Sequence, residues 1–267
     1  MAKIGVFDSG VGGLSILDEA LRRSPSHEYL YFADSANAPY GEKSSDWVTN
    51  RSLEISLFLV KEGCDAIVVA CNTATTGAIA KIRAALPNTP IIGVEPGIKP
   101  AAMVSTKKIV GVLATANTLK SDKFKALLAT LPADCQFITQ AGIGLVPLIE
   151  NGELENPEID VLLEKYISPM IEAGADTLVL GCTHYPFLAE KIKARFGEQL
   201  KLVDTSEAII RQMNKLVNHQ TNSDAIRGCV HFYSTSNGED LLNKSKALMA
   251  TDLNMHPLDF FTIELSQ

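Results

Sequence analysis

Several features that assign proteins to specialised classes are missing from this 267-residue sequence. No apolar run approaches the ~18 residues that cross a bilayer, and the amino terminus lacks the basic segment and cleavage site of a signal peptide. Lysines and arginines form no run longer than a pair, and the net charge of −7 argues against binding to nucleic acid or an anionic membrane. We therefore expect a cytoplasmic globular protein.

Cysteines are few and widely spaced. The chain has five of them, an odd number, at Cys64, Cys71, Cys135, Cys182 and Cys229. An odd, dispersed set favours reduced thiols over a disulfide framework, and the absence of a close Cys-x-x-Cys pair disfavours a structural zinc site. We expect no metal, and we interpret Cys64, Cys135 and Cys229 as small buried apolar residues.

The sequence does contain an internal repeat. Residues 62–73, Glu-Gly-Cys-Asp-Ala-Ile-Val-Val-Ala-Cys-Asn-Thr, return at residues 173–184 as Ala-Gly-Ala-Asp-Thr-Leu-Val-Leu-Gly-Cys-Thr-His. In each copy a Gly-x-Asp turn leads into an aliphatic run that ends at Cys71 or Cys182. Such a run predicts a buried parallel strand whose carboxyl end carries a thiol. Two equivalent thiols suit chemistry on both faces of one small molecule.

The order of the predicted elements indicates an α/β protein. Strands are predicted at residues 4–8, 28–33, 66–71, 91–94, 109–113, 136–139, 177–182 and 200–203, and helices after Ser44, at 157–174 and from Pro186 to Gly197. This alternation predicts right-handed crossovers and parallel sheets. Because residues 4–9 also match residues 110–115, we expect two similar parallel-sheet sandwich domains related by pseudo-two-fold symmetry, with the active site in the cleft between them.

The last part of the chain holds a helical pattern, a predicted strand at residues 229–233 and an apolar run near 260–263. We expect it to return to the first domain. Residues 1–96 and 211–267 would then form one discontinuous domain, and residues 97–210 the other. A separate carboxyl-terminal subdomain is the alternative.

Polar side chains gather where the predicted strands end. Ligands of open α/β sheets bind outside these carboxyl ends, where helix N-termini favour carboxylates and thiolates. The residues at these ends are Asp8, Ser9, Asp34, Tyr40, Gly41, Cys71, Asn72, Thr73, Thr115, Thr118, Cys182, Thr183 and His184. We therefore expect a small ligand that bears a carboxylate.

Several of these candidates have a purely structural alternative. In that interpretation Asp8 is the N-cap of the predicted helix that follows it. His184 is a hydrogen-bonded surface histidine, and Glu150 is a solvated residue after an apolar run. In the same interpretation, the turn around Tyr40 is only a stiff loop. The glycine turn at residues 10–13 resembles the start of a dinucleotide site, but its spacing and the preceding acidic residue disfavour nucleotide binding.

Four motifs together resemble the glutamate racemase family, whose members supply D-glutamate for bacterial peptidoglycan without a cofactor. They are Phe-Asp-Ser-Gly-Val-Gly-Gly at residues 7–13, Tyr-Phe-Ala-Asp-Ser at 31–35 with Pro-Tyr-Gly at 39–41, Cys-Asn-Thr at 71–73, and Leu-Gly-Cys-Thr-His-Tyr-Pro at 180–186. The resemblance spans nearly the whole chain. It implies an amino-acid racemase that needs no pyridoxal phosphate, takes glutamate as its small-molecule substrate and forms a homodimer.

Carried over by position, the resemblance makes Cys71 the base that deprotonates D-glutamate and Cys182 the base that deprotonates L-glutamate. It adds Asp8, His184 and Glu150 as further catalytic residues. The implied substrate-binding residues are Asp8, Ser9, Tyr40, Gly41, Asn72, Thr73, Thr115, Thr118, Thr183 and His184. Phe124 stands where the family has tyrosine.

Racemisation explains why two bases are useful, because one base takes the α-proton from one face while the other donates a proton from the opposite face. Other functions stay open at this point. They are racemisation of aspartate, hydrolysis by a Cys182–His184 pair, and binding of an amino acid without reaction. A Schiff-base lysine with pyridoxal phosphate is also not excluded by the sequence alone.

Overall fold

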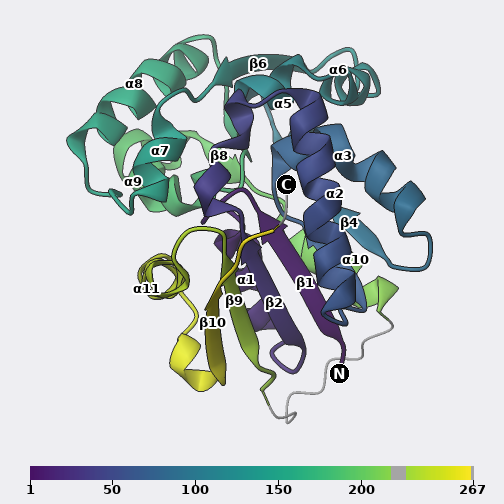
Figure 1. The fold of residues 1–267 in the computed structure, drawn as a ribbon. Helices are drawn as coiled ribbons and strands as arrows, with labels where there is room; N and C mark the ends of the chain where they lie inside the picture. Colours follow the sequence, from purple (N-terminus) through teal and green to yellow (C-terminus); the bar gives the residue numbers. More distant parts are fainter. Residues whose placement is uncertain (218–226, 266–267) are drawn as a thin grey trace. The chain divides into compact units, whose positions relative to one another are not determined.

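A computed structural model describes residues 1–217 and 227–265, and the chain divides into two compact units (Figure 1). One unit comprises Met1–Val94 and Ser206–Gln267, and the other comprises Glu95–Thr205. Each unit contains a parallel sheet, so the expected α/β fold with two parallel sheets is confirmed. The division into functional domains at 1–96 with 211–267 and at 97–210 remains a prediction. Within the described residues, no helix combines the length and the apolar composition needed to cross a bilayer.

The first unit is built on a six-stranded sheet with the order β10-β9-β2-β1-β3-β4. Its strands are β1 (Lys3–Asp8), β2 (Glu28–Ala33), β3 (Ala66–Val69), β4 (Ile91–Gly93), β9 (Val230–Ser234) and β10 (Leu258–Thr262). All neighbouring strands pair in parallel. The late strands β9 and β10 therefore extend the sheet beyond β2, as Figure 1 shows.

Helices cover both faces of this sheet. They are α1 (Leu14–Arg23), α2 (Ser45–Lys61), α3 (Asn72–Ala85), α10 (Ser206–Leu216) and α11 (Gly238–Leu248). Helices α2 and α3 share one apolar cluster with Phe7, Leu30 and Val69 of the sheet. Tyr29 lies on the opposite face, because side chains alternate along a strand, and its hydroxyl donates to the carbonyl of Ala20 in α1 at 3.3 Å. The strands are thus buried between two helical layers.

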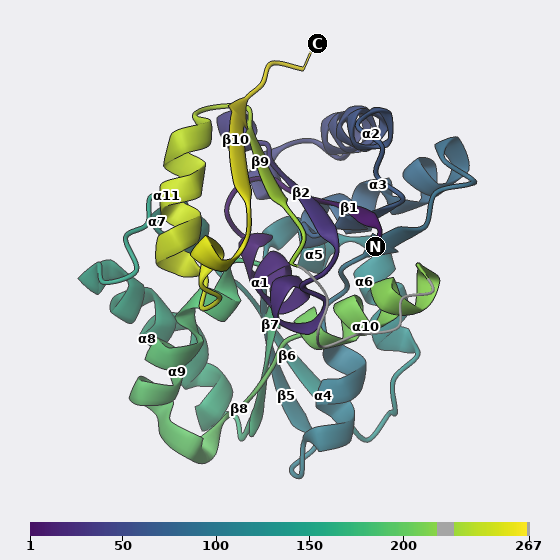
Figure 2. The same cartoon turned by 90° about the horizontal axis from the view of Figure 1, so that it is seen from below.

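The second unit repeats this plan around a four-stranded sheet with the order β6-β5-β7-β8. Its strands are β5 (Ile109–Ala114), β6 (Gln136–Ala141), β7 (Thr177–Gly181) and β8 (Lys201–Val203), and its helices are α4 (Ile98–Val104), α5 (Ala116–Lys120), α6 (Asp122–Ala129), α7 (Leu145–Glu150), α8 (Pro157–Glu172) and α9 (Ala189–Phe196). Helices α4 and α6 share a core with Val110 and Val112. On the other face, a Cβ at Gly111 would lie 2.6 Å from Sδ of Met170 in α8, so the absence of a side chain lets α8 pack closely. Figure 2 shows α4 and α8 on opposite sides of this sheet.

The Gly-x-Asp turns of the repeat play the same structural role in both units. Gly63 and Gly174 have φ angles of 84° and 98°, in the left-handed region that favours glycine. The aspartate that follows anchors the entry to the first strand: Asp65 accepts a hydrogen bond from the backbone N–H of Lys3 at 2.8 Å. Asp176 accepts hydrogen bonds from the segment before β5, namely from Ser105, Thr106 and Lys107. Each repeated segment therefore links a turn, a strand and a terminal cysteine.

Candidate active site

Cys71 lies between β3 and α3 and is the N-cap of that helix. Its Sγ accepts a hydrogen bond from the backbone N–H of Ala74 at 3.5 Å, and the residue is 5% exposed. Unpaired N–H groups and the macrodipole at a helix N-terminus stabilise negative charge. The first half of the repeat thus holds a sulfur where a thiolate is favoured.

The residues that follow Cys71 are tied to the neighbouring strand ends. Asn72 and Thr73 are buried in the first turn of α3, and the Asn72 amide donates to the carbonyl of Val94 at 3.1 Å. Thr75 donates to the carbonyl of Val69 and accepts from the N–H of Val94, both at 3.0 Å. These bonds fix the start of α3 against the ends of β3 and β4.

Asp8 ends β1 at the same sheet edge as Cys71, because β1 and β3 are parallel and Phe7 lies opposite Val69. It is fully buried, and its Oδ1 accepts from the N–H of Gly10 at 3.0 Å and from the hydroxyl of Ser9 at 3.4 Å. The interpretation of Asp8 as a helix N-cap is wrong.

Helix α1 instead begins at Leu14 with Gly13 as its N-cap. A Cβ at Gly13 would lie 2.8 Å from Cβ of Asp8 and 2.9 Å from Cβ of Ala70, closer than side chains approach one another. The glycine turn therefore lets α1 start close to the Asp8 side chain.

Tyr40 and Gly41 lie in a short 3₁₀ turn, Tyr40–Glu42, that follows the cis Ala38–Pro39 peptide bond. The Tyr40 hydroxyl donates to Oδ2 of Asp34 at 2.6 Å. Burial alone would raise the pKa of Asp34, but hydrogen bonds from Arg51 and Tyr40 outweigh it and hold this pKa below its usual value. A buried carboxylate thus fixes the tyrosine of this turn.

Arg51 was missed by the sequence analysis. Its Nε and Nη2 donate to the two carboxylate oxygens of Asp34 at 2.9 and 2.8 Å, and the hydroxyl of Thr235 donates to Oδ1 at 3.0 Å. Arg51 and Thr235 stand far from Asp34 in the sequence, and no local pattern marks either of them. Together they make Asp34 a junction between β2, α2 and the end of β9.

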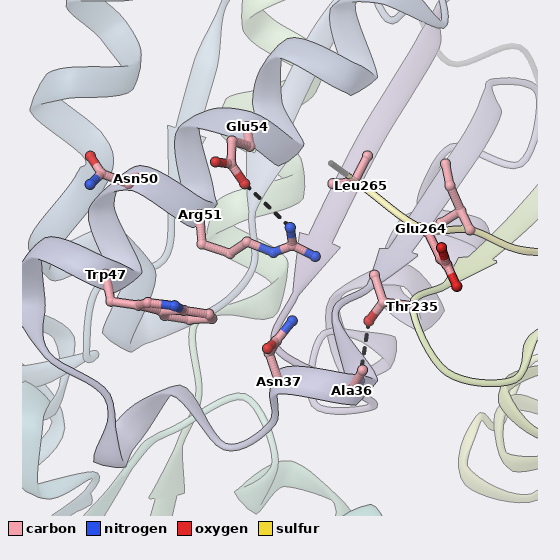
Figure 3. Close-up of a pocket in the computed structure, with 10 residues that line it drawn as sticks. Ala36, Asn37, Trp47, Asn50, Arg51, Glu54, Thr235, Glu264 and Leu265 are labelled. Carbon is pink, nitrogen blue, oxygen red and sulfur yellow. Dashed lines mark hydrogen bonds and ion pairs between the residues drawn. The ribbon is translucent and has the colours of Figure 1, made fainter. Parts of the chain in front are cut away.

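A pocket of about 800 Å³ opens on the outer side of this junction (Figure 3). Trp47, Arg51 and Glu54 of α2 line it, opposite Thr235 and Glu264. Figure 3 shows the Arg51–Glu54 ion pair along α2 on one side of the pocket. Its lining contains none of the predicted site residues, so we assign it no part in the reaction.

In the second unit, Cys182 directly follows β7, and its Sγ lies 3.6 Å from Nδ1 of His184. The other ring nitrogen, Nε2, lies 2.5 Å from Oε1 of Glu150, the last residue of α7. His184 is 3% exposed, so its interpretation as a surface histidine is wrong, and Glu150 is paired rather than merely solvated.

Two effects on the His184 pKa oppose each other. Burial lowers it, but the hydrogen bonds and charges of Cys182 and Glu150 prevail and raise it well above the usual histidine value. The imidazolium form is therefore favoured beside the sulfur. An imidazolium next to a cysteine is an arrangement that supports a thiolate.

The remaining predicted residues of this unit lie near the ends of neighbouring strands. Thr183 is buried beside Cys182. Thr115 follows β5, which pairs with β7, and its Oγ1 accepts from the N–H of Thr118 at 3.2 Å and lies 2.9 Å from that hydroxyl. Phe124 is buried in the core shared by α4 and α6.

The other three cysteines differ from Cys71 and Cys182. Cys64 and Cys135 are buried as expected, and burial raises the pKa of Cys64 to about 12. Cys229 is only partly buried, so the interpretation of this residue as a buried apolar side chain is wrong.

The structure thus gathers two sets of predicted residues, one in each unit. The first set is Asp8, Ser9, Tyr40, Gly41, Cys71, Asn72 and Thr73, near the carboxyl ends of β1, β2 and β3. The second set is Thr115, Thr118, Glu150, Cys182, Thr183 and His184, near the carboxyl ends of β5 and β7. Their catalytic and binding roles remain predictions.

Sequence comparisons show which known proteins this chain resembles. Residues 7–213 match the family model described as Asp/Glu/Hydantoin racemase. The chain is 58% identical over 219 residues to a glutamate racemase of Cupriavidus pinatubonensis, covering 82% of this chain and 80% of that protein. It is 44% identical to a glutamate racemase of Pseudomonas putida, covering 90% and 91% of the two chains.

Solved structures agree with the sequence matches. The glutamate racemase isoform RacE1 of Bacillus anthracis superposes with a TM-score of 0.85 at 28% identity, covering 99% of this chain and 98% of that chain. Escherichia coli glutamate racemase, solved with L-glutamate and the activator UDP-MurNAc-ala, has a TM-score of 0.82 at 31% identity and covers 98% and 99% of the two chains.

Proposed function

Because the chain belongs to the Asp/Glu/Hydantoin racemase family, we propose that it interconverts L- and D-glutamate with two cysteine bases and no cofactor. The observation that carries this proposal is the equivalent position of Cys71 and Cys182 at the ends of β3 and β7. Each sulfur has its own means of stabilising negative charge, a helix N-terminus for Cys71 and a histidine for Cys182. Glutamate racemases at 44–58% identity support the choice of substrate.

The proposed reaction moves one proton on each face of the α-carbon. With L-glutamate, Cys182 enters as the thiolate and takes the α-proton, forming a thiol and a carbanionic intermediate. Cys71 enters as the thiol and protonates the opposite face, forming D-glutamate and a thiolate. The enzyme then has the protonation state that accepts D-glutamate, so the reverse reaction uses the same two groups in exchanged roles.

The remaining site residues bind and orient glutamate in this proposal. Backbone N–H groups near Cys71, with the side chains of Ser9, Asn72, Thr73 and Thr183, would hold its carboxylates and stabilise charge that develops at the α-carboxylate. Tyr40, Gly41, Thr115 and Thr118 extend the binding surface. Asp8 would serve the Cys71 side and His184, held by Glu150, the Cys182 side, as partners of the substrate ammonium or of the moving proton.

We also propose the cellular setting. D-glutamate made by this reaction would supply peptidoglycan synthesis, and the chain would act in the cytoplasm as a homodimer. Both bases require reduced thiols, which that compartment maintains, and all five cysteines are free in the structure. Sedimentation of the purified protein tests the dimer.

The direct test is incubation of the purified protein with L-glutamate in D2O without pyridoxal phosphate. We expect the circular dichroism of the substrate to decay to zero. At early times, α-deuterium should appear in the D-glutamate formed and not in the remaining L-glutamate, because the proton taken by one thiol is not the one returned by the other. Aspartate in a parallel reaction should be turned over far more slowly.

Substitution of single cysteines tests which residues are the bases. Cys71→Ser and Cys182→Ser should each lower kcat by about 10²–10⁴-fold, the usual contribution of a general acid or base. The matched controls Cys64→Ser and Cys135→Ser should retain activity. Activity that survives Cys71→Ser with an acyl-enzyme intermediate would establish a hydrolase instead, and binding without α-hydrogen exchange would establish a binding protein.

A further inference from the structure

A second group of reactive side chains lies at the opposite end of the first sheet. Cys229 precedes β9, His231 lies on β9, and Asp259 lies on β10 directly opposite His231. Because alternate residues of a strand share a face, Cys229 and His231 project to the same side. These outer strands run side by side in Figure 1, and the cluster sits at their amino ends, whereas Cys71 follows the carboxyl end of β3.

The three side chains converge on one point. Nδ1 of His231 lies 3.1 Å from Oδ2 of Asp259, and Sγ of Cys229 lies 3.9 Å from each of these two atoms. A tetrahedral Zn²⁺ with bonds of about 2.0–2.3 Å separates its ligand atoms by about 3.3–3.6 Å. The observed triangle therefore needs only small side-chain adjustments to surround such an ion.

The surroundings of His231 point the same way. Its Nε2 lies 3.1 Å from Oε1 of Glu28, which in turn lies 3.0 Å from Nζ of Lys3. A histidine that binds a metal through one nitrogen usually donates its other N–H to a carboxylate, which fixes the tautomer and the ring orientation. Donation of the Nε2–H to Glu28 leaves the Nδ1 lone pair available to a metal ion beside Asp259.

We propose that Cys229 Sγ, His231 Nδ1 and Asp259 Oδ2 bind one divalent transition-metal ion, with Zn²⁺ the best match. A mixed sulfur, nitrogen and oxygen donor set suits zinc and disfavours magnesium and calcium. His231 and Asp259 have side-chain exposures of 19% and 55%, so water reaches the fourth position. The ion joins β9 to β10 and stabilises the edge of the sheet.

Sequence spacing did not reveal this site, because a close Cys-x-x-Cys pair places both of its ligands within one turn. Here Cys229 directly precedes β9 and His231 lies on it, and Asp259 reaches them only through the pairing of β9 with β10. Glu28 joins from a third strand, β2. Three strands distant in sequence thus complete the site and its support.

The test is titration of chelator-treated, full-length protein with ZnCl2, in a Cys71→Ser/Cys182→Ser background that removes the thiols of the proposed active site. We expect one zinc per chain by calorimetry and a higher midpoint of thermal unfolding, because an ion that binds only the folded state stabilises it. Replacing Zn²⁺ by Co²⁺ should give thiolate-to-cobalt charge-transfer absorption, which Cys229→Ser should abolish.

Further variants separate ligands from their support. Glu28→Gln, which removes the carboxylate that contacts both His231 and Lys3 but keeps all three ligands, should weaken zinc binding by about 10- to 100-fold. Loss of a ligand in Cys229→Ser or His231→Gln should weaken it more. Cys135→Ser in the same background should bind zinc unchanged. Asp259→Asn changes a surface side chain and serves as the ligand variant least disruptive to folding.

Zinc bound equally well by the parent, Cys229→Ser and Asp259→Asn would overturn the proposal, as would the absence of stoichiometric zinc in a folded parent protein. Asp259→Asn in the otherwise unmodified chain should leave glutamate racemisation unchanged. The metal site and the proposed activity can therefore fail independently.

Discussion

At the scale of single residues, the two copies of the repeat stabilise charge on sulfur by different means. Cys71 is the N-cap of α3, whereas Cys182 lies beside a buried histidine. A helix N-terminus is a fixed dipole that does not titrate, but an imidazole gains and loses a proton. We therefore expect the two directions of the proposed reaction to respond differently to pH and to substitution.

Glu150→Gln tests this difference. Burial of His184 lowers its pKa, and Glu150 is one of the groups that raise it, so the substitution should lower that pKa. The imidazolium should then be lost at lower pH, moving the basic limb of the L-glutamate pH profile to lower pH. We expect kcat to fall by about 10- to 100-fold, part of what general acid–base catalysis contributes.

The measurements are kcat/KM against pH in both directions and NMR titration of the His184 ring. The control is Glu155→Gln, a change at an exposed glutamate of the same unit that pairs with Lys191. An unchanged His184 titration in Glu150→Gln would contradict the assigned role of Glu150 as a positioning residue.

At the scale of elements, the aspartates of the repeat occupy equivalent places but differ in burial. Asp176 is 7% exposed and accepts hydrogen bonds at 2.5–2.9 Å from four residues, Ser105, Thr106, Lys107 and Thr177. Burial would raise its pKa, but these hydrogen bonds outweigh it and lower the pKa far below the usual aspartate value. Asp65 is exposed and accepts one bond from Lys3.

Asp176→Asn should destabilise the protein by about 2–3 kcal/mol, because at least one buried donor then loses a charged acceptor. Asp65→Asn should cost about 0.5–1 kcal/mol, as for an ordinary hydrogen bond. A lowered pKa in the folded state contributes stability that is complete above the unfolded value of about 3.9 and is lost as the pH falls below it.

Urea unfolding at neutral and acidic pH measures both effects. The difference between the parent and Asp176→Asn should shrink as the pH falls below about 4. Equal effects of the two substitutions at neutral pH would contradict the greater burial of Asp176.

Most elements were predictable because their patterns are local. The strand predicted at residues 28–33 is β2 as predicted, and the helix predicted after Ser44 is α2, with the Ser44 hydroxyl accepting from the N–H of Trp47. The strand predicted to end at Cys71 ends at Val69, since α3 begins directly after the cysteine and the cysteine itself is its N-cap. Periodicity identifies the buried run but not the point where a cap ends it.

Contacts between distant segments were not predictable in the same way. The bonds from Arg51 to Asp34 join residues that no motif links, whereas the family resemblance already implied an acidic residue at Glu150 near His184. Asp34 follows the end of β2 but Arg51 lies within α2, so their pairing depends on how strands and helices pack. The Cys71 and Cys182 positions were accessible because the repeat marks them, and their roles remain predictions.

At the scale of the whole molecule, the two units differ in continuity. Residues Glu95–Thr205 form a unit from one stretch of chain, with its own core around α4, α6 and β5. The other unit needs both Met1–Val94 and the segment from Ser206 onward, because β9 pairs with β2.

Fragments test this difference. Residues 95–205 expressed alone should fold, with dispersed amide resonances and cooperative unfolding, because their hydrophobic core is internal to the fragment. Residues 1–94 alone should not fold stably, since the outer edge of β2 and the carboxylate of Asp34 lose their partners from β9 and Thr235. Adding residues 206–267 in trans should restore folding, and a stable fold of 1–94 by itself would contradict the prediction.

The contacts of Asp34 also become possible in a fixed order during translation. Asp34 and Tyr40 emerge early, but the Thr235 hydroxyl that completes the junction is translated only after the entire second unit. At about 5–20 residues per second, translation of Glu95–Thr205 alone takes roughly 5–20 s. The Asp34 junction of the nascent amino-terminal segment therefore lacks its hydrogen bond from Thr235 until the chain beyond the second unit has been translated.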